Sequence, residues 1–460
     1  MAVNVPLLLT GQIWHTYDFP THLFFASHYQ HDWWSLWEPR WFEGFDVASY
    51  PPLPHQLAAL LGWIIGDGNA INLLTFGSVV CLPVSTYFMA KSYIGPVAAS
   101  RSAALAVVIP SVLFSAYSFG QLPTLFALDT SLFAATALGG YMRRGSVGFL
   151  FLLIALIGTT VASHHATFIF LGPPLFGCIF VAEFLASHER SQTVVRMTVA
   201  TIASVGVAIV AILPFWIWHA TEYVAQTAID HASRHDFLTD PASQKVFFWS
   251  EHGILIAAIG LAVPLVFRRP KQLVPWYGLA VGMMVIGLGG TTPVPRLLFG
   301  DQWNWLTYDR FSLWSDVGMV VLFGALASSI LDRPGRPSAV ASFAWWFTLV
   351  GLGAYGVTDA LRPTLISTLP PPIDLKPIVT FLESDGRDQW RYLTLGFGEQ
   401  AGILNAQSTA QTVDGYFFTA RRIPILTESG IGQIDRNLDL DPKAKVTHAL
   451  LRDPAPHALK

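Results

Sequence analysis

Near the start of the chain, Asp18 and His22 lie four residues apart. Four residues make about one turn of an α-helix, so the two side chains would share a helix face and could share a proton or a metal ion. The structural alternative for Asp18 is an N-cap. Asp favours that position and Pro the first turn, so Asp18 would cap a helix running from Pro20 to about Trp37. The two roles are compatible.

Arg310, in "LTYDRFSLW" (306–314), is the main candidate for binding a phosphate group. A guanidinium group binds two phosphate oxygens at once through parallel N–H donors. The alternative is an ion pair between Arg310 and its neighbour Asp309. Arg296 is a weaker candidate for the same role, and Arg40 is weaker still.

His164 and His165 end an apolar segment and are candidates for contact with a substrate. With Asp18 and His22 they are also the candidate ligands of a divalent cation, Mg or Mn. Eleven of the fourteen histidines fall at or beyond the predicted outer surface. For most of these, a simple interfacial position is the preferred interpretation.

Asp129 lies inside an apolar segment, where an ionisable group usually faces a cavity or a partner. It is therefore a candidate substrate-binding residue, with a hydrogen bond inside a helix bundle as the alternative. The polar loop "AIDHASRHDFLTD" (228–240) adds the candidates Asp230 and His231 and is expected to cover the site as a flap.

These residues must be positioned by membrane helices. The hydrophobic fraction is 52% and the mean hydropathy is +0.47, too apolar for a soluble chain of 460 residues. A helix needs about 20 apolar residues to cross a bilayer. The sequence predicts an all-α polytopic protein with about 10–11 transmembrane helices. Ten segments qualify: 70–90, 102–119, 122–141, 146–163, 166–186, 197–218, 253–267, 273–290, 312–331 and 338–357.

Lys and Arg cluster in alternate short connections, which the positive-inside bias places in the cytoplasm. The residues are Lys91, Arg101, Arg143, Arg144, Arg190, Arg196, Arg268, Arg269, Lys271, Arg333 and Arg336. The chain is therefore predicted to lie in the cytoplasmic (inner) membrane with its long loops and C-terminal region outside. Cys81 and Cys178 fall inside apolar spans and imply no disulfide framework.

Two regions are expected: a membrane domain, 1–357, and an extracytoplasmic α/β domain, 358–460. The first outer loop, 14–69, is too polar to cross the membrane and is predicted to form juxtamembrane helices, the second over 51–66. Met1 to Ile13 lacks the features of a signal peptide and is short for a span, which predicts that the first transmembrane helix is truncated or that its start codon is misplaced. The tail reaches Lys460 without a closing element, which predicts an incomplete domain.

The acid near the start, followed by "RWFEGF" and "YPPLPHQL", resembles a known pattern. It is similar to the GT-C superfamily of glycosyltransferases that use polyprenyl-phosphate sugars. Within it, the chain resembles the membrane family labelled "6-pyruvoyl-tetrahydropterin synthase related", although nothing in the sequence indicates pterin chemistry. Further likeness lies in "GQLPTLFALD" (120–129), "SHHATF" (163–168), "LTYDRFSLW" and "VDGYFFTARRIPIL".

The resemblance implies an inverting glycosyltransferase, a hexosyl- or pentosyltransferase, acting on the extracytoplasmic side. Its donor would be a lipid-linked sugar, and its acceptor a hydroxyl of a glycan, lipid or protein. Superfamily members use an acid in the first loop as base or to orient the acceptor, and here that acid is Asp18. Many members have two adjacent acids, whereas this chain has Tyr17-Asp18-Phe19. Arg310 and the His164/His165 pair would stabilise the phosphate leaving group.

The alternative is a non-catalytic membrane transporter or a lipid or polysaccharide assembly protein. A transporter would be expected to show related halves or several deep ionisable residues, and the sequence shows no duplication. Partners are expected to include membrane lipids and no nucleic acid. The sequence contains no glycine-rich phosphate loop or dinucleotide-binding motif.

Overall fold

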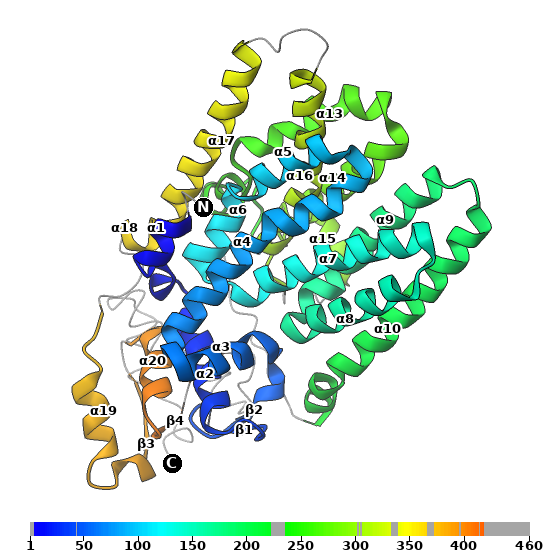
Figure 1. Ribbon diagram of the computed structural model, residues 1–460. Helices are drawn as coiled ribbons and strands as arrows, with labels where there is room; N and C mark the ends of the chain where they lie inside the picture. Colours follow the sequence, from blue (N-terminus) through cyan, green and yellow to red (C-terminus); the bar gives the residue numbers. More distant parts are fainter. Residues whose placement is uncertain are drawn as a thin grey trace. The chain divides into compact units, whose positions relative to one another are not determined.

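The structure is a computed structural model, and it describes residues 4–42, 44–221, 235–300, 303, 306–332, 339–365, 372–394, 397–413 and 415–417. The protein is a predominantly helical, polytopic membrane protein (Figure 1). Contacts within the chain define two compact units. Unit 1 comprises 1–10, 75–211 and 229–361, and unit 2 comprises 11–74, 212–228 and 362–460. The predicted division at residue 357 stays a prediction.

Eight helical segments in the described ranges are long and apolar enough to cross a membrane. They are Asp67–Ile94, Pro96–Phe119, Leu122–Arg144, Thr167–Ala186, Arg190–Ile217, Gln244–Arg268, Asp309–Leu331 and Ala339–Ala360. Two further predicted spans form α8 (Val147–Ser163) and α14 (Pro270–Ile286), of 17 residues each. At 1.5 Å per residue they reach about 26 Å, less than the roughly 30 Å of a hydrocarbon core.

Unit 1 is built on a few long helices. The helix α16 (Asp309–Leu331) packs against α5 (Pro96–Ala106), α14 and α13 (Ala257–Arg268). The helix α7 (Leu122–Arg144) packs against α8 and α9 (Gly172–Ala186), which Figure 1 shows beside it. The remaining helices of unit 1 are α1 (Asn4–Leu9), α6 (Pro110–Phe114), α11 (Pro241–Ser243), α12 (Ser250–His252), α15 (Pro293–Phe299) and α17 (Ala339–Ala360). The helices α4 (Asp67–Ile94) and α10 (Arg190–Thr221) have residues in both units.

In the described part of unit 1, three π-helical turns interrupt the helices: η3 (Ser115–Phe119), η4 (Thr167–Leu171) and η6 (Gln244–Trp249). A 3-10 turn, η7 (Gly253–Ile256), then joins α12 to α13. Single π turns inside helices are often found at functional sites. The helical run that contains the predicted span 253–267 begins earlier than expected. The π turn η6, α12 and η7 extend it back to Gln244.

Unit 2 contains the first loop and the described part of the tail. It has η1 (Gln12–His15), α2 (Phe19–His31), β1 (Trp37–Glu38), β2 (Phe45–Asp46), η2 (Val47–Ser49), α3 (Leu53–Ile65), α18 (Arg362–Leu365), α19 (Lys376–Glu383), η9 (Arg387–Gln389), β3 (Arg391–Tyr392), α20 (Gln400–Gln407) and β4 (Gln411–Thr412). The strands β1 and β2 pair antiparallel, with Trp37 opposite Asp46, and β3 and β4 pair parallel.

The helix predicted from Pro20 to about Trp37 begins at Phe19 and ends at His31. The prediction of its end was wrong because tertiary pairing overrides the local sequence. Asp32 leaves the helical conformation at φ −143°, and Trp37 then enters the hairpin. Gly44 makes this hairpin possible: its φ is +103°, and a Cβ atom there would lie 2.0 Å from the Trp37 ring.

Aromatic side chains form the core of unit 2. The buried residues are Phe24, Phe25, Tyr29, Trp41, Phe42, Phe45, Val47 and Ala59. The rings of Phe24 and Trp41 stack with centroids 3.5 Å apart and planes 7° apart. The motif "RWFEGF" therefore supplies core residues, and this core holds α2 in place.

Candidate functional site

Asp18 immediately precedes α2 and is half-buried. Its backbone has φ −91° and ψ −9°, outside the extended conformation usual for an N-cap, and its side chain makes no capping hydrogen bond. The predicted capping role is therefore wrong. The role of Asp18 as a base stays a prediction.

His22 lies one turn further along, and its backbone N–H donates to the carbonyl of Asp18 over 3.0 Å. Its ring lies against His55, the third residue of α3. His22 Nδ1 and His55 Nε2 are 2.9 Å apart, and both side chains are buried. Tyr50 packs edge-on against both imidazoles, with its ring centroid 5.1 Å from that of His55.

The pKa of His55 is held well below its usual value. Burial is the main cause, and a charge on His22 would lower it further, outweighing a hydrogen bond at Pro51. His55 is therefore neutral at neutral pH. His55 was not among the site residues predicted from the sequence. The available signal was the proline-rich "YPPLPHQL", which starts α3 and sets His55 in its first turn.

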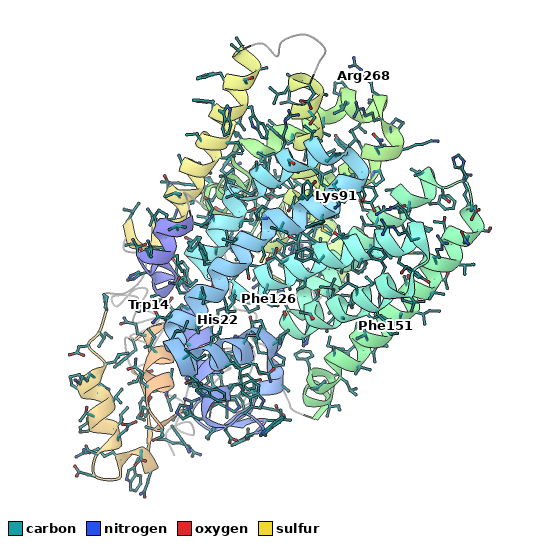
Figure 2. The ribbon with its side chains drawn as sticks, in the orientation of Figure 1. Trp14, His22, Lys91, Phe126, Phe151 and Arg268 are labelled. Atoms are coloured by element: carbon teal, nitrogen blue, oxygen red, sulfur yellow. The ribbon has the colours of Figure 1, made fainter. Side chains whose placement is uncertain are left out.

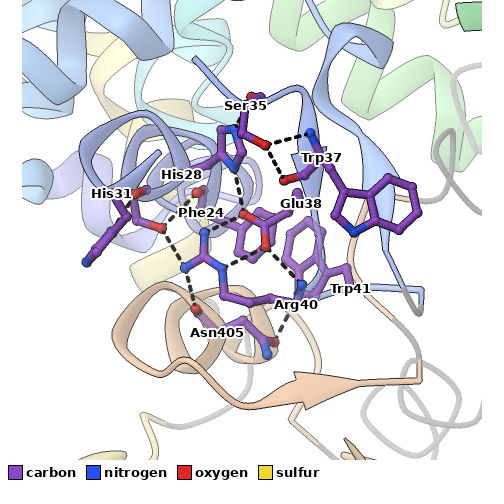
Figure 3. Close-up of polar contacts among 10 residues, drawn as sticks. Phe24, His28, His31, Ser35, Trp37, Glu38, Arg40, Trp41 and Asn405 are labelled. Carbon is purple, nitrogen blue, oxygen red and sulfur yellow. Dashed lines mark hydrogen bonds and ion pairs between the residues drawn. The ribbon is translucent and has the colours of Figure 1, made fainter. Parts of the chain in front are cut away.

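Arg40, the weakest phosphate candidate, donates hydrogen bonds to Glu38 and Asn405 in unit 2 (Figure 3). Its Nη2 and Nε donate to the two carboxylate oxygens of Glu38 over 2.6 and 2.8 Å, and its Nη1 donates to the carbonyl of Asn405. His28 Nδ1 lies 2.9 Å from Glu38. Burial raises the pKa of Glu38, but hydrogen bonds from Arg40 and His28 and the charge of Arg40 lower it to about 2.

This network is structural, because each Arg40 donor group already has a protein acceptor. Arg40 also joins the first loop to the tail segment within unit 2. Trp41 Nε1 donates to Asn405 Oδ1, and Asn405 Nδ2 donates to the hydroxyl of Tyr392. The sequence placed these segments in separate domains, and nothing in the motifs indicates that Asn405 is the partner of Arg40.

In unit 1, Arg310 lies in the first turn of α16 and is half-buried. Its Nη1 donates to the Thr307 hydroxyl, and its Nε donates to Thr124 Oγ1 over 3.3 Å. The predicted alternative, an ion pair with Asp309, is wrong. Asp309 Oδ2 instead accepts from Gln121 Nε2 over 2.9 Å. Within the described ranges, the Arg310 guanidinium has no carboxylate partner.

Three phenylalanine rings pack against one another and connect the elements next to the candidates His164, His165, Arg296 and Arg310. Phe170 of η4 lies with its ring centroid 5.5 Å from Phe299 of α15 and 5.6 Å from Phe311 of α16. The π turn η4 follows His164 and His165, α15 carries Arg296, and α16 carries Arg310. The structure therefore brings these sequence-predicted residues to adjoining elements at one end of unit 1.

The two histidines differ within this arrangement. His164 ends α8 and is buried, with Nδ1 2.8 Å from the Thr167 hydroxyl and accepting from the Thr167 N–H. His165 is half-buried, and burial lowers its pKa to about 4. Arg296 is exposed, and its guanidinium lies 4.7 Å from the ring centroid of Trp303.

Asp129 is buried in α7, where its Oδ1 accepts from Ser85 Oγ over 2.9 Å. This is the bundle hydrogen bond given as its alternative, and a role in substrate binding stays a prediction. Asp230 and His231 lie outside the described residues. No group of three or more His, Cys, Asp or Glu side chains in the described ranges is arranged to hold a metal ion.

A buried acidic cluster in unit 1 was missed by the sequence analysis. Glu251 has about 1% of its surface exposed, and neither carboxylate oxygen has a hydrogen-bond partner in the described part of the chain. Asp309, Asp316 and Asp359 are close enough to interact with it electrostatically. Asp316 accepts from Ser111 over 2.6 Å and lies 2.9 Å from His252 Nδ1. His252, predicted at or beyond the outer surface, is buried within Gln244–Arg268 because that run begins before it.

Comparison with solved structures identifies the fold. The chain is similar to the oligosaccharyltransferase of Archaeoglobus fulgidus tethered with an acceptor peptide, with a TM-score of 0.58 and 12% identity over 91% of this chain and 64% of that one. A complex of the Archaeoglobus fulgidus enzyme with an inhibitory peptide and a dolichol-phosphate gives 0.55 and 12% over 91% and 65%. Its complex with Zn and sulfate gives 0.55 and 13% over 88% and 59%.

The chain therefore has the polytopic fold of GT-C glycosyltransferases, and it spans about three fifths of the length of the oligosaccharyltransferase structures it matches. No protein-family model and no curated protein matches the sequence.

Proposed function

We propose that this protein is a glycosyltransferase that moves a sugar from a polyprenyl-phosphate donor to an acceptor hydroxyl, with inversion, on the extracytoplasmic side of the inner membrane. The half-buried Arg310 guanidinium, which no described carboxylate neutralises, carries the proposal. In a protein with a GT-C fold, such a group is suited to bind the phosphate of a lipid-linked donor. The Archaeoglobus fulgidus relative binds a dolichol-phosphate, which supports this class of ligand.

Asp18 is the proposed base. The carboxylate takes the proton of the acceptor hydroxyl. The oxygen of that hydroxyl bonds to the anomeric carbon of the sugar, and the bond from that carbon to the phosphate oxygen breaks. The leaving phosphate departs with the bonding electron pair. Arg310, with His164 and His165, is proposed to stabilise that negative charge. His22 is proposed to position or assist Asp18, since it lies one turn away and is held by His55.

The predicted divalent cation remains a separate prediction. A metal would need ligands beyond those that the described residues bring together, and no step above depends on one. The narrower resemblance to the pterin-synthase-related family, the identity of the sugar as a hexose or pentose, and the acceptor (glycan, lipid or protein) also remain proposals. Transfer assayed with and without EDTA, followed by added Mg or Mn, would test the metal.

The first experiment is transfer of radiolabelled sugar from polyprenyl-phosphate donors in membranes, comparing wild type with Asp18→Asn. The substitution keeps the size of the side chain. Asp18 makes no capping hydrogen bond, so the substitution removes no cap from α2. We expect transfer to fall about 10²-fold or more, in line with loss of a general base. The matched control is Asp32→Asn at the exposed C-terminal end of the same helix, which should retain transfer.

Transfer that persists in a folded Asp18→Asn protein would exclude Asp18 as the base. No transfer from any donor by the wild-type protein would instead favour a transporter or an assembly protein.

A further inference from the structure

A cavity of about 530 Å³ lies in unit 1 at the opposite end of α16 from Arg310. It is lined by residues 94–98, where α4 ends and α5 begins, by the end of α13 and by the end of α16. The 23 residues of α16 extend about 34 Å, close to the thickness of a hydrocarbon core. The cavity therefore lies about one bilayer thickness from Arg310, at the end that the basic connections predict to be cytoplasmic.

The lining carries a net positive charge. Arg268 and Arg269 are exposed at the end of α13, where Figure 2 labels Arg268. In the described part of the chain, neither guanidinium has an ion-pair or hydrogen-bond partner. The one acid of the lining, Asp332, is already paired: Arg101 donates to both its oxygens over 2.6 Å. Hydrogen bonds from Arg101 outweigh burial and lower the pKa of Asp332, so it stays ionised.

Apolar side chains adjoin the two arginines. Phe267, the neighbour of Arg268, is 80% exposed, and Val97 in the lining is 55% exposed. A positively charged cavity bordered by exposed apolar groups at a helix end matches the headgroup and first acyl carbons of a lipid. Basic pockets between transmembrane helices on the cytoplasmic side bind anionic headgroups in this way.

We propose that this cavity binds the phosphate of an anionic phospholipid, with Arg268 and Arg269 as its ligands. The site is distinct from Arg310, because the two lie at opposite ends of α16. Its ligand is a component of the membrane and neither donor nor acceptor. The arginines would bind the headgroup, and Phe267 and Val97 would contact the chains.

The test is titration of the full-length purified protein with phosphatidylglycerol, followed by native mass spectrometry. Parallel titrations use phosphatidylcholine and inorganic phosphate. We expect phosphatidylglycerol to bind well above the other two. The double variant Arg268→Gln/Arg269→Gln should weaken phosphatidylglycerol binding about 30-fold, because it removes two arginines that each attract an anionic headgroup. The control Arg144→Gln/Arg190→Gln removes the same charge from other cytoplasmic connections and should change binding less than about twofold.

A second variant tests the cavity without altering charge. Val97→Trp is placed at an exposed position and would fill the space, so it should also weaken phosphatidylglycerol binding. Equal loss in the control pair, or equal binding of phosphatidylcholine, would overturn the proposal. Inorganic phosphate binding as tightly as the lipid would assign the arginines to a free anion and would overturn the lipid assignment.

Discussion

Nδ1 of His22 and Nε2 of His55 lie 2.9 Å apart inside unit 2, although 33 residues separate them in the chain. One nitrogen must carry a hydrogen and the other a lone pair, so the pair is incompatible with two positive charges. The neutral state of His55 therefore helps to fix the orientation of His22, one turn from Asp18.

This pair predicts a pH dependence of stability. The pKa of His55 in the folded protein is well below that of the unfolded chain, so below about pH 6.5 the unfolded state binds a proton that the folded state does not. Lowering the pH from about 7 to 5 should therefore lower the free energy of unfolding, by up to about 1.4 kcal/mol per pH unit. His55→Gln should reduce this slope, measured as the change in Tm with pH at a fixed scan rate.

His15→Gln, at an exposed position in the same unit, is the control and should keep the wild-type slope. Identical slopes in His55→Gln and wild type would show that His55 is not held neutral by the fold.

The buried Glu38–Arg40 pair predicts a large stability loss on substitution. Glu38→Gln leaves the Arg40 guanidinium uncompensated, and breaking a buried pair in this way costs about 3–5 kcal/mol. The same pair should be lost on acidification, since its stabilisation is present above the carboxyl pKa of the unfolded state and disappears as the pH falls toward about 2. Denaturant unfolding of unit 2, followed by tryptophan fluorescence, measures the loss.

Glu383→Gln at the exposed end of α19 provides a matched control with little expected effect. A Glu38→Gln protein as stable as this control would mean that the network contributes nothing measurable.

Arg310→Gln is expected to raise the KM for the polyprenyl-phosphate donor about 10-fold to 100-fold, because charge-assisted hydrogen bonds contribute about 1.5–3 kcal/mol. Arg310→Lys should recover part of the affinity, since Lys keeps the charge but not the paired donors. Arg296→Gln should have a smaller effect, because Arg296 is exposed and stacks on Trp303. Steady-state transfer kinetics at varied donor concentration give the comparison. An unchanged KM in Arg310→Gln would contradict donor binding by this residue.

Two neighbouring acids in unit 1 should respond in opposite directions. Glu251 is buried without a described hydrogen-bond partner, so Glu251→Gln removes a carboxyl group that is costly to bury and should leave Tm unchanged or raise it. Asp316→Asn disturbs the contacts with Ser111 and His252 and should cost about 1–3 kcal/mol. Thermal unfolding in detergent compares the two. A large Tm loss in Glu251→Gln would indicate a binding partner for that carboxylate.

The sequence by itself determined the membrane helices, because hydropathy over about 20 residues is a local property that sums along the chain. It also predicted the short α3, and it made Arg310 a candidate phosphate ligand from residue type and position. It could not predict where α2 ends, because Trp37 pairs with Asp46 in the β1–β2 hairpin and not with the helix.

Only the tertiary structure decided which side chains meet. Asp309 binds Gln121 and not its neighbour Arg310, Asn405 binds Arg40 and Trp41, and His22 meets His55. These pairs depend on the packing of elements far apart in the chain. A polar group buried by that packing must find its hydrogen-bond partner among whichever side chains the packing brings within reach.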